Sequence, residues 1–296
     1  MDMLELKLGY ACNNNCVFCL NKEKRYYKKF PVKFLKNKIN ISAQQGCERL
    51  ILSGGEPLIS LHLFDLISFA KSRGYKKLEI HTNGRMLSYE DFVKKLLTFS
   101  PIGFLVSFHF PTPLLYMKYS QVDGFDQTIN GIKKLVKYRC GFTVNTVLMK
   151  PNLPYLKEIV DLLRNLKAKS IQYTFIDGHN ILPEYKKFVP RYSQVVKILE
   201  KIIKQNPDFQ IKIRDIPTCI LKKQLINHLA PIHFSERINL TIGKRFFTSE
   251  GIREMQSVYP NCEGCVYRSN CFGIKKAYFQ IYGSDELKPV KRMWKE

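Results

Sequence analysis

The chain has 296 residues, of which 45% are hydrophobic, enough to build a sizeable core in a globular protein. No apolar run approaches the length that crosses a bilayer, and the start lacks a basic segment followed by an apolar stretch. We therefore expect a soluble, cytoplasmic protein without a membrane partner.

The formal net charge is +23, from 48 lysines and arginines against 25 acidic residues. An excess of this size attracts polyanions, so RNA is one candidate partner, and a lysine-rich composition on solvated faces is an equally weighted alternative. Part of the charge lies in residues 22–36, where cations alternate with aromatic residues. Those aromatics can stack on bases or form the core face of a helix.

Short apolar segments alternate with longer amphipathic ones, which is typical of strand–helix units and a parallel sheet. Gly-rich and polar residues follow the second and third predicted strands, so the functional loops are expected at the carboxyl ends of the strands. The pattern predicts a partial (β/α)6 TIM-type barrel over residues 1–178. Its expected strands are residues 4–8, 49–53, 77–81, 102–108, 142–148 and 170–175, and its helices residues 33–45, 61–72, 89–97, 126–138 and 154–166.

The strand–helix rhythm changes after residue 178. A predicted helix at residues 194–204 and a short strand at residues 210–214 precede a segment that contains proline and cysteine. We interpret residues 179–296 as a C-terminal extension that holds a smaller domain at about residues 210–285.

Three cysteines, Cys12, Cys16 and Cys19, follow the first predicted strand. Three thiolates in one short loop can hold a cube of iron and sulfide while leaving one iron open for chemistry. Zinc is the alternative, although structural zinc sites usually have paired Cys-x-x-Cys units and four ligands. Phe18 would lie beside the cluster, where its ring could cover a flat ligand or exclude water.

The spacing Cys-x-x-x-Cys-x-x-Cys at residues 12–19, with Gly-Gly-Glu-Pro at residues 54–57, resembles the radical S-adenosylmethionine (radical SAM) enzymes. The resemblance implies that the three cysteines hold a [4Fe–4S] cluster whose fourth iron binds S-adenosylmethionine. It also implies reductive cleavage of that sulfonium to a 5′-deoxyadenosyl radical, which abstracts hydrogen from a substrate. An external electron donor of the flavodoxin or ferredoxin type would supply the electron.

The Gly-Gly-Glu segment is expected to bind the cofactor. By the resemblance, Gly54, Gly55 and Glu56 contact the methionine amino group, and the glycines let the backbone come close to the ligand. The alternative for the two glycines alone is a plain turn between a strand and a helix.

Polar residues at later strand ends are expected to reach the ribose and adenine. The resemblance points to Ser107 and Asn145, and to residues 82–83 after the third strand. Each of these is equally explained as a turn or cap residue. We interpret the strand-end histidines His81 and His109 as structural, and no catalytic residue is assigned.

A second set of cysteines, Cys262, Cys265 and Cys271, lies near the C-terminus. It resembles the auxiliary-cluster segment of the SPASM and twitch extensions behind radical SAM barrels, except that a further cysteine of the SPASM pattern is replaced by Lys275. With no other cysteine downstream, we predict that Cys219 completes a single, twitch-like auxiliary [4Fe–4S] cluster. A four-cysteine zinc ribbon is the alternative.

The substrate is less constrained than the cofactor. SPASM and twitch extensions commonly accompany enzymes that modify peptides or proteins, so the resemblance favours a peptide or protein side chain. The positive charge supports tRNA or another RNA, and small-molecule cofactor biosynthesis stays open. An alternative of another class is a non-catalytic, zinc-stabilised RNA-binding module, which would have no need of the ligand loop at residues 54–57.

Overall fold

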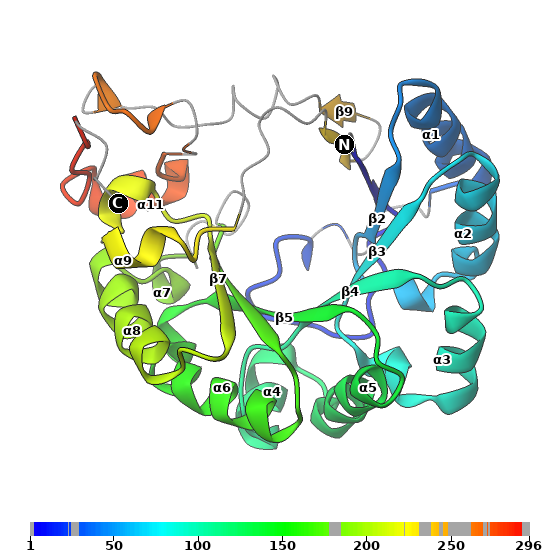
Figure 1. The fold of residues 1–296 in the computed structure, drawn as a ribbon, viewed down its shortest axis with the longest axis horizontal. Helices are drawn as coiled ribbons and strands as arrows, with labels where there is room; N and C mark the ends of the chain where they lie inside the picture. Colours follow the sequence, from blue (N-terminus) through cyan, green and yellow to red (C-terminus); the bar gives the residue numbers. More distant parts are fainter. Residues whose placement is uncertain are drawn as a thin grey trace.

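The computed structural model describes residues 3–22, 24, 30–177, 185–221, 223–230, 238–242, 245–247, 262–268, 271 and 273–291. Its strands form one curved sheet, and helices cover the outer, convex side of that sheet (Figure 1). The strand order is β7-β6-β5-β4-β3-β2-β1-β8-β9. The described part of the chain therefore builds an open crescent.

The first seven strands run in chain order, and each is parallel to the next. This arrangement confirms the predicted partial barrel, and the six expected strands agree with the observed ones to within one residue at either end. The strands are β1 Met3–Lys7, β2 Arg49–Ser53, β3 Lys77–Thr82, β4 Ile102–Ser107, β5 Phe142–Leu148, β6 Ser170–Phe175 and β7 Gln210–Arg214, followed by β8 Ile238–Ile242 and β9 Arg245–Phe247.

Strand β7 differs from its expected place in a smaller domain, because it pairs in parallel with β6 and extends the main sheet. Its Ile211 and Ile213 are 3% and 0% exposed, so they add to the apolar layer between the sheet and its helices. Because β8 also pairs in parallel with β1, the parallel run in the described residues has eight strands, where the rhythm of the sequence predicts six. Residue 178 lies outside the described residues, so the domain boundary stays a prediction.

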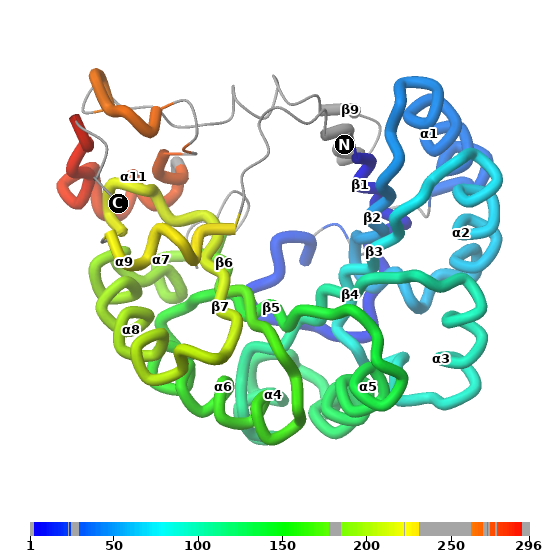
Figure 2. Tube along the Cα trace, in the orientation of Figure 1, coloured from blue at the N-terminus to red at the C-terminus, as the bar shows by residue number. Residues whose placement is uncertain are grey.

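The helices follow the sheet from α1–α3 at one end of the crescent, past α5 and α6, to α8 at the other (Figure 2). Within the described residues, none is long and apolar enough to cross a membrane. The helices are α1 Val32–Gln44, α2 Leu63–Ser72, α3 Glu90–Leu97, α4 Pro113–Ser120, α5 Phe125–Lys137, α6 Leu156–Asn165, α7 Tyr185–Phe188, α8 Tyr192–Gln205, α9 Lys223–Ile226 and α11 Lys276–Tyr282.

The two faces of the sheet differ in polarity. Alternate side chains such as Leu4, Leu50 and Ile80 are completely buried beneath the helices. The intervening positions, such as Glu5 and His81, line a pocket on the concave side. Since successive side chains of a strand point to opposite faces, the concave side receives the polar set. A closed barrel of this type usually fills its interior with branched apolar residues, so this interior is suited to hold ligands.

The C-terminal helix α11 packs on the end of the crescent formed by β6 and α8. The ring of Tyr278 lies 4.2 Å from that of Tyr192 and 5.9 Å from that of Phe175. The rings thus tie the described part of the extension to the barrel.

The basic and aromatic segment at residues 22–36 is partly described. Phe30 and Phe34 pack against the hydrophobic core, and their rings lie 5.8 Å apart. These two aromatic residues therefore face the core, which is the second of the two alternatives for this segment. Residues 25–29 lie outside the described residues.

Candidate active site

The cysteine loop forms one wall of a pocket of about 330 Å³ on the concave side, at the carboxyl ends of the strands. Cys12, Cys16 and Cys19 all line it, facing the Gly54-Gly55 turn that follows β2. The structure thus brings together the two motifs that the sequence singles out. Ser107 and Phe18 also line the pocket, and Phe18 is 8% exposed.

The two glycines are required because the cysteine loop and the turn after β2 touch backbone to backbone. A Cβ on Gly55 would lie 2.1 Å from the carbonyl oxygen of Ala11, and one on Gly54, whose φ is +128°, would lie 2.3 Å from that of Gly9. Gly55 N donates to Gly9 O, and Glu56 N to Ala11 O, both at 2.8 Å. The glycines therefore fix the cysteine loop as well as shaping the ligand pocket.

Glu56 is placed differently from its two glycine neighbours. Its side chain is 3% exposed, and it does not line the pocket. Its carboxylate accepts hydrogen bonds from Leu58 N, Thr82 Oγ1 and Asn83 N. Burial raises the pKa of Glu56 to about 7, against the opposing effect of these donors. The side chain thus connects the turn after β2 to the turn after β3, and its predicted contact with the methionine amino group stays a prediction.

The turn after β3 holds the cysteine loop through side chains. Asn83 Nδ2 donates to Asn13 Oδ1 at 2.7 Å and approaches Cys12 Sγ at 3.9 Å. The Arg85 guanidinium donates to Asn13 O and, at 3.0 Å, to Asn14 Oδ1. Arg85 thus supports the cysteine loop, which the sequence does not reveal, because its partners are backbone and amide oxygens that only the fold brings close.

Helix α4 supports the cysteine loop from the other side. Asn15 N donates to Ser120 O at 2.8 Å, and Val17 N donates to Tyr119 O at 3.0 Å. The Asn14 amide donates to Tyr116 Oη at 3.2 Å. The loop is therefore held by β2, β3 and α4 together.

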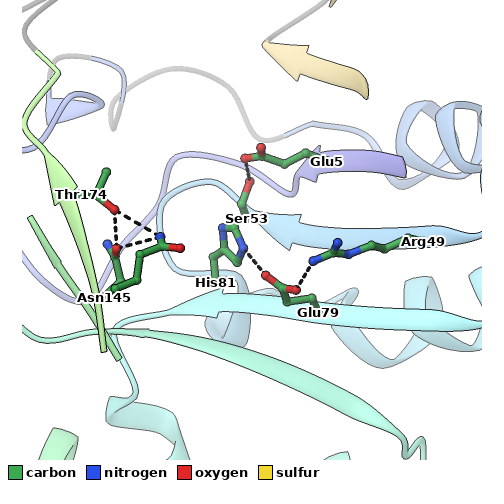
Figure 3. A network of polar contacts seen from close by, with 8 residues as sticks. Glu5, Arg49, Ser53, Glu79, His81, Asn145 and Thr174 are labelled. Carbon is green, nitrogen blue, oxygen red and sulfur yellow. Dashed lines mark hydrogen bonds and ion pairs between the residues drawn. The ribbon is translucent and has the colours of Figure 1, made fainter. Parts of the chain in front are cut away.

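A charged network lies on the concave face beside the pocket (Figure 3). Glu79 contacts Arg49 at 2.5 Å and His81 Nε2 at 2.8 Å. Burial alone would raise the pKa of Glu79, but the hydrogen bond and charge of His81, with those of Arg49, lower it to about 2. The carboxylate is therefore ionised and accepts a hydrogen bond from His81 Nε2, so this ring nitrogen carries a proton.

Of the two strand residues predicted to contact the ribose and adenine, Ser107 lines the pocket and Asn145 does not. Ser107 and Asn145 are partners in the register of β4 and β5, but Asn145 is not among the residues that line the pocket. Its Oδ1 instead accepts hydrogen bonds from Thr174 Oγ1 at 2.6 Å and Gln172 Nε2 at 3.2 Å (Figure 3). Thr82 and Asn83 do line the pocket.

His109 closes the pocket behind Phe18. The two rings meet edge to face, with centroids 5.1 Å apart. Burial lowers the pKa of His109 to about 4, and its Nδ1 accepts a hydrogen bond from Val147 N. This histidine is therefore neutral at physiological pH, and its structural role stays a prediction.

The cysteine loop fits an iron–sulfur cluster by its donors and surroundings. Cys12 Sγ accepts from Asn14 N at 3.4 Å as well as from Asn83, and N–H donors to sulfur stabilise a ligating thiolate. In the described ranges, no three His, Cys, Asp or Glu side chains are arranged to hold a single metal ion.

The four C-terminal cysteines line one small pocket of about 20 Å³ beside Pro217 and Leu287, although no three of these described side chains are arranged to hold a metal ion. Burial raises the pKa of Cys219 to about 11, and the nearby thiols Cys271, Cys265 and Cys262 add to the shift. Cys271 Sγ accepts from Gly273 N at 3.4 Å, the kind of contact seen at Cys12.

A sequence comparison identifies the family. The pattern of the Radical SAM superfamily matches residues 6–163, which include both motifs of the pocket. The chain belongs to the radical SAM superfamily, and it is an enzyme of a class that uses a [4Fe–4S] cluster and S-adenosylmethionine.

The chain also resembles curated proteins at low identity. It is 26% identical over 216 residues to the probable GTP 3′,8-cyclase of Sulfurisphaera tokodaii, covering 72% of this chain and 67% of that protein. The corresponding protein of Methanocaldococcus jannaschii is 25% identical over 210 residues, or 69% of either chain.

Solved structures share the fold. Native anSMEcpe with bound AdoMet has a TM-score of 0.70 at 14% identity, covering 98% of this chain and 93% of that one. Streptococcus suis SuiB bound to precursor peptide SuiA has a TM-score of 0.70 at 15% identity, covering 97% of this chain and 74% of that one.

Proposed function

We propose that this chain cleaves S-adenosylmethionine reductively and uses the resulting 5′-deoxyadenosyl radical to abstract hydrogen from a substrate bound on the concave face. The observation that carries the proposal is the shared pocket of Cys12, Cys16 and Cys19 with the Gly54-Gly55 turn. When bound, the cluster and S-adenosylmethionine supply the electron and the carbon radical.

Each group of pocket residues would have its own role in binding the cluster or the cofactor. The three cysteines would hold the cluster, and the backbone of Gly54 and Gly55 would face the methionine end of the cofactor. Ser107 lines the same pocket from β4 and can reach a polar group of the ligand. Phe18 would exclude water, since it is buried between the cysteine loop and His109.

For the extension, we infer one auxiliary [4Fe–4S] cluster held by Cys219, Cys262, Cys265 and Cys271, as in a twitch domain. The small pocket that all four cysteines line supports it. Zinc is the competing occupant, because four thiolates suit either metal.

For the substrate, we propose a purine nucleotide such as GTP. The name of the relatives supports it, and so does the charge of the concave face. Lys212 and Arg214 alternate with the buried residues of β7, so they point to the concave side, beside Gln172 and Thr174 of β6. Cations suit phosphates, and the amide of Gln172 suits a base edge.

A peptide or protein side chain is the second candidate. SuiB bound to its precursor peptide superimposes on 97% of this chain, including the extension that the matched family segment leaves out. Enzymes of this superfamily need an electron donor in either case.

The test is anaerobic reconstitution followed by measurement of 5′-deoxyadenosine after addition of S-adenosylmethionine and dithionite. The wild type and Cys140→Ala should form it, and Cys16→Ala should not. Addition of GTP should accelerate its formation and give a modified nucleotide by mass spectrometry. Stimulation by peptides or by bulk tRNA, and not by GTP, would assign the other substrate classes. Failure of the wild type to form 5′-deoxyadenosine would refute the function.

A further inference from the structure

Helix α4 exposes apolar side chains directly outside the cysteine loop. Leu114 is 71% exposed and Met117 is 47% exposed. Residues three apart lie on one side of a helix, so the two form a single apolar face, which the exposed Lys118 borders. Exposed apolar patches rimmed by polar residues often mark protein interaction sites.

The opposite side of the same helix holds the cysteine loop. The carbonyl groups of Tyr119 and Ser120 accept hydrogen bonds from the loop backbone, and Tyr116 bonds to the Asn14 side chain. A helix is about 10 Å across, so the apolar face lies only about one helix diameter from the thiols. An electron delivered to this face has a short path to the site that Cys16 lines.

The concave side is a poor approach for an electron carrier protein. The thiols open there into a pocket of about 330 Å³, which the proposed S-adenosylmethionine would occupy. A protein cannot enter a space of that size, so a protein that reduces the cluster has to approach from outside the barrel.

The charges around the loop suit an acidic partner. Residues 109–122, which contain α4, include no aspartate or glutamate, and neither do residues 9–22, which contain the cysteine loop. The acidic Asp123 and Asp126 follow beyond the end of the helix. With Lys118 on the helix and a net charge of +23, an acidic protein meets attraction and not repulsion at this face.

We propose that the outer face of α4, formed by Leu114, Met117 and Lys118, is the docking surface for an acidic one-electron carrier protein of the flavodoxin or ferredoxin type. The inference rests on the proposed function, because only a cluster at the cysteine loop needs such a donor. The carrier binds across the helix and delivers one electron at a time towards the loop.

The test compares two reductants on the reconstituted enzyme. In Leu114→Glu/Met117→Glu, the concentration of reduced flavodoxin that gives half-maximal 5′-deoxyadenosine formation should rise at least tenfold, because carboxylates replace the apolar contact and repel the acidic carrier. The rate with dithionite, which needs no docking, should stay at the wild-type value. Leu61→Glu is the matched control, since Leu61 is 89% exposed just before α2 and should leave both rates unchanged.

Each outcome decides the inference. An unchanged carrier dependence in the double variant overturns it, as does a wild type that neither flavodoxin nor ferredoxin reduces. An equal loss with dithionite would show that the face is structural, which also overturns it. A wild type that forms no 5′-deoxyadenosine even with dithionite refutes the proposed function instead.

Discussion

Glu79 binds the imidazole of His81 at 2.8 Å through one carboxylate oxygen, while Arg49 holds the other at 2.5 Å. All three side chains lie on the concave face, and the His81 and Glu79 side chains are 26% and 25% exposed. The hydrogen bond to Glu79, which Arg49 orients, holds the histidine in one orientation at the edge of the ligand pocket.

The same carboxylate makes stability depend on pH. The pKa of Glu79 is lowered to about 2 in the folded chain, so its stabilising contribution is complete above the unfolded value near 4.5 and is lost as the pH falls towards 2. We expect Glu79→Gln to remove about 3 kcal/mol of stability at pH 7 and to flatten the dependence between pH 4.5 and 2. Urea unfolding of the wild type and the variant across this pH range measures the free energy of unfolding. The same pH dependence in both proteins would contradict a stabilising role of the ionised Glu79.

Gly55→Ala should prevent the cluster from being held. Its new methyl group would meet the Ala11 carbonyl at 2.1 Å, so the cysteine loop has to move away from the turn after β2. We expect iron content and visible absorbance after reconstitution to fall to less than half of the wild-type value. Gly141→Ala is the control, because no atom lies within 4 Å of its added Cβ. Full iron content in Gly55→Ala would show that the close contact has no consequence for the loop.

Arg85→Ala should weaken the cysteine loop without unfolding the barrel. It removes the bonds to Asn13 and Asn14 together with the 2.6 Å bond to Gln127. Loss of charged hydrogen bonds of this kind costs about 1.5–3 kcal/mol each in buried settings, which is large for a short loop. The cluster should therefore be lost faster under a chelator. Arg139→Ala, at an exposed site, should behave as the wild type, and equal rates in both variants would count against Arg85 as a support.

The C-terminal cysteines can be tested apart from the N-terminal ones. A variant with alanine at Cys12, Cys16 and Cys19 should retain about four irons per chain if the extension holds its own [4Fe–4S] cluster. Iron, sulfide and zinc assays on the purified variant distinguish the occupants. Zinc without sulfide assigns the ribbon alternative, and absence of both metals rejects the four-cysteine site.

Much of the barrel could be predicted because its strands carry a strong local signal. Segments such as Arg49–Ser53 and Ser170–Phe175 are short and rich in aliphatic, β-branched or aromatic residues, and their observed bounds equal the expected ones. The cysteine loop and the Gly54-Gly55 turn could be recognised for a similar reason, since their spacing is local.

The parts that were missed depend on tertiary contacts. Helix α4 lacks a clear polar side, because apolar and aromatic residues surround its axis, so its sequence does not predict an amphipathic helix. The place of β7 depends on pairing with β6 across the intervening helices α7 and α8, and that of Glu56 depends on Thr82 and Asn83, which lie far from it in sequence. No local pattern contains this information.

The sheet ends with β7 on one side and with β9 on the other, and these two strands do not pair with each other. The contacts described above that hold the cysteine loop come from β2, β3 and α4, and none of them involves β7 at the far end of the sheet. Side chains of β7 can therefore change without disturbing the contacts that hold the cysteine loop.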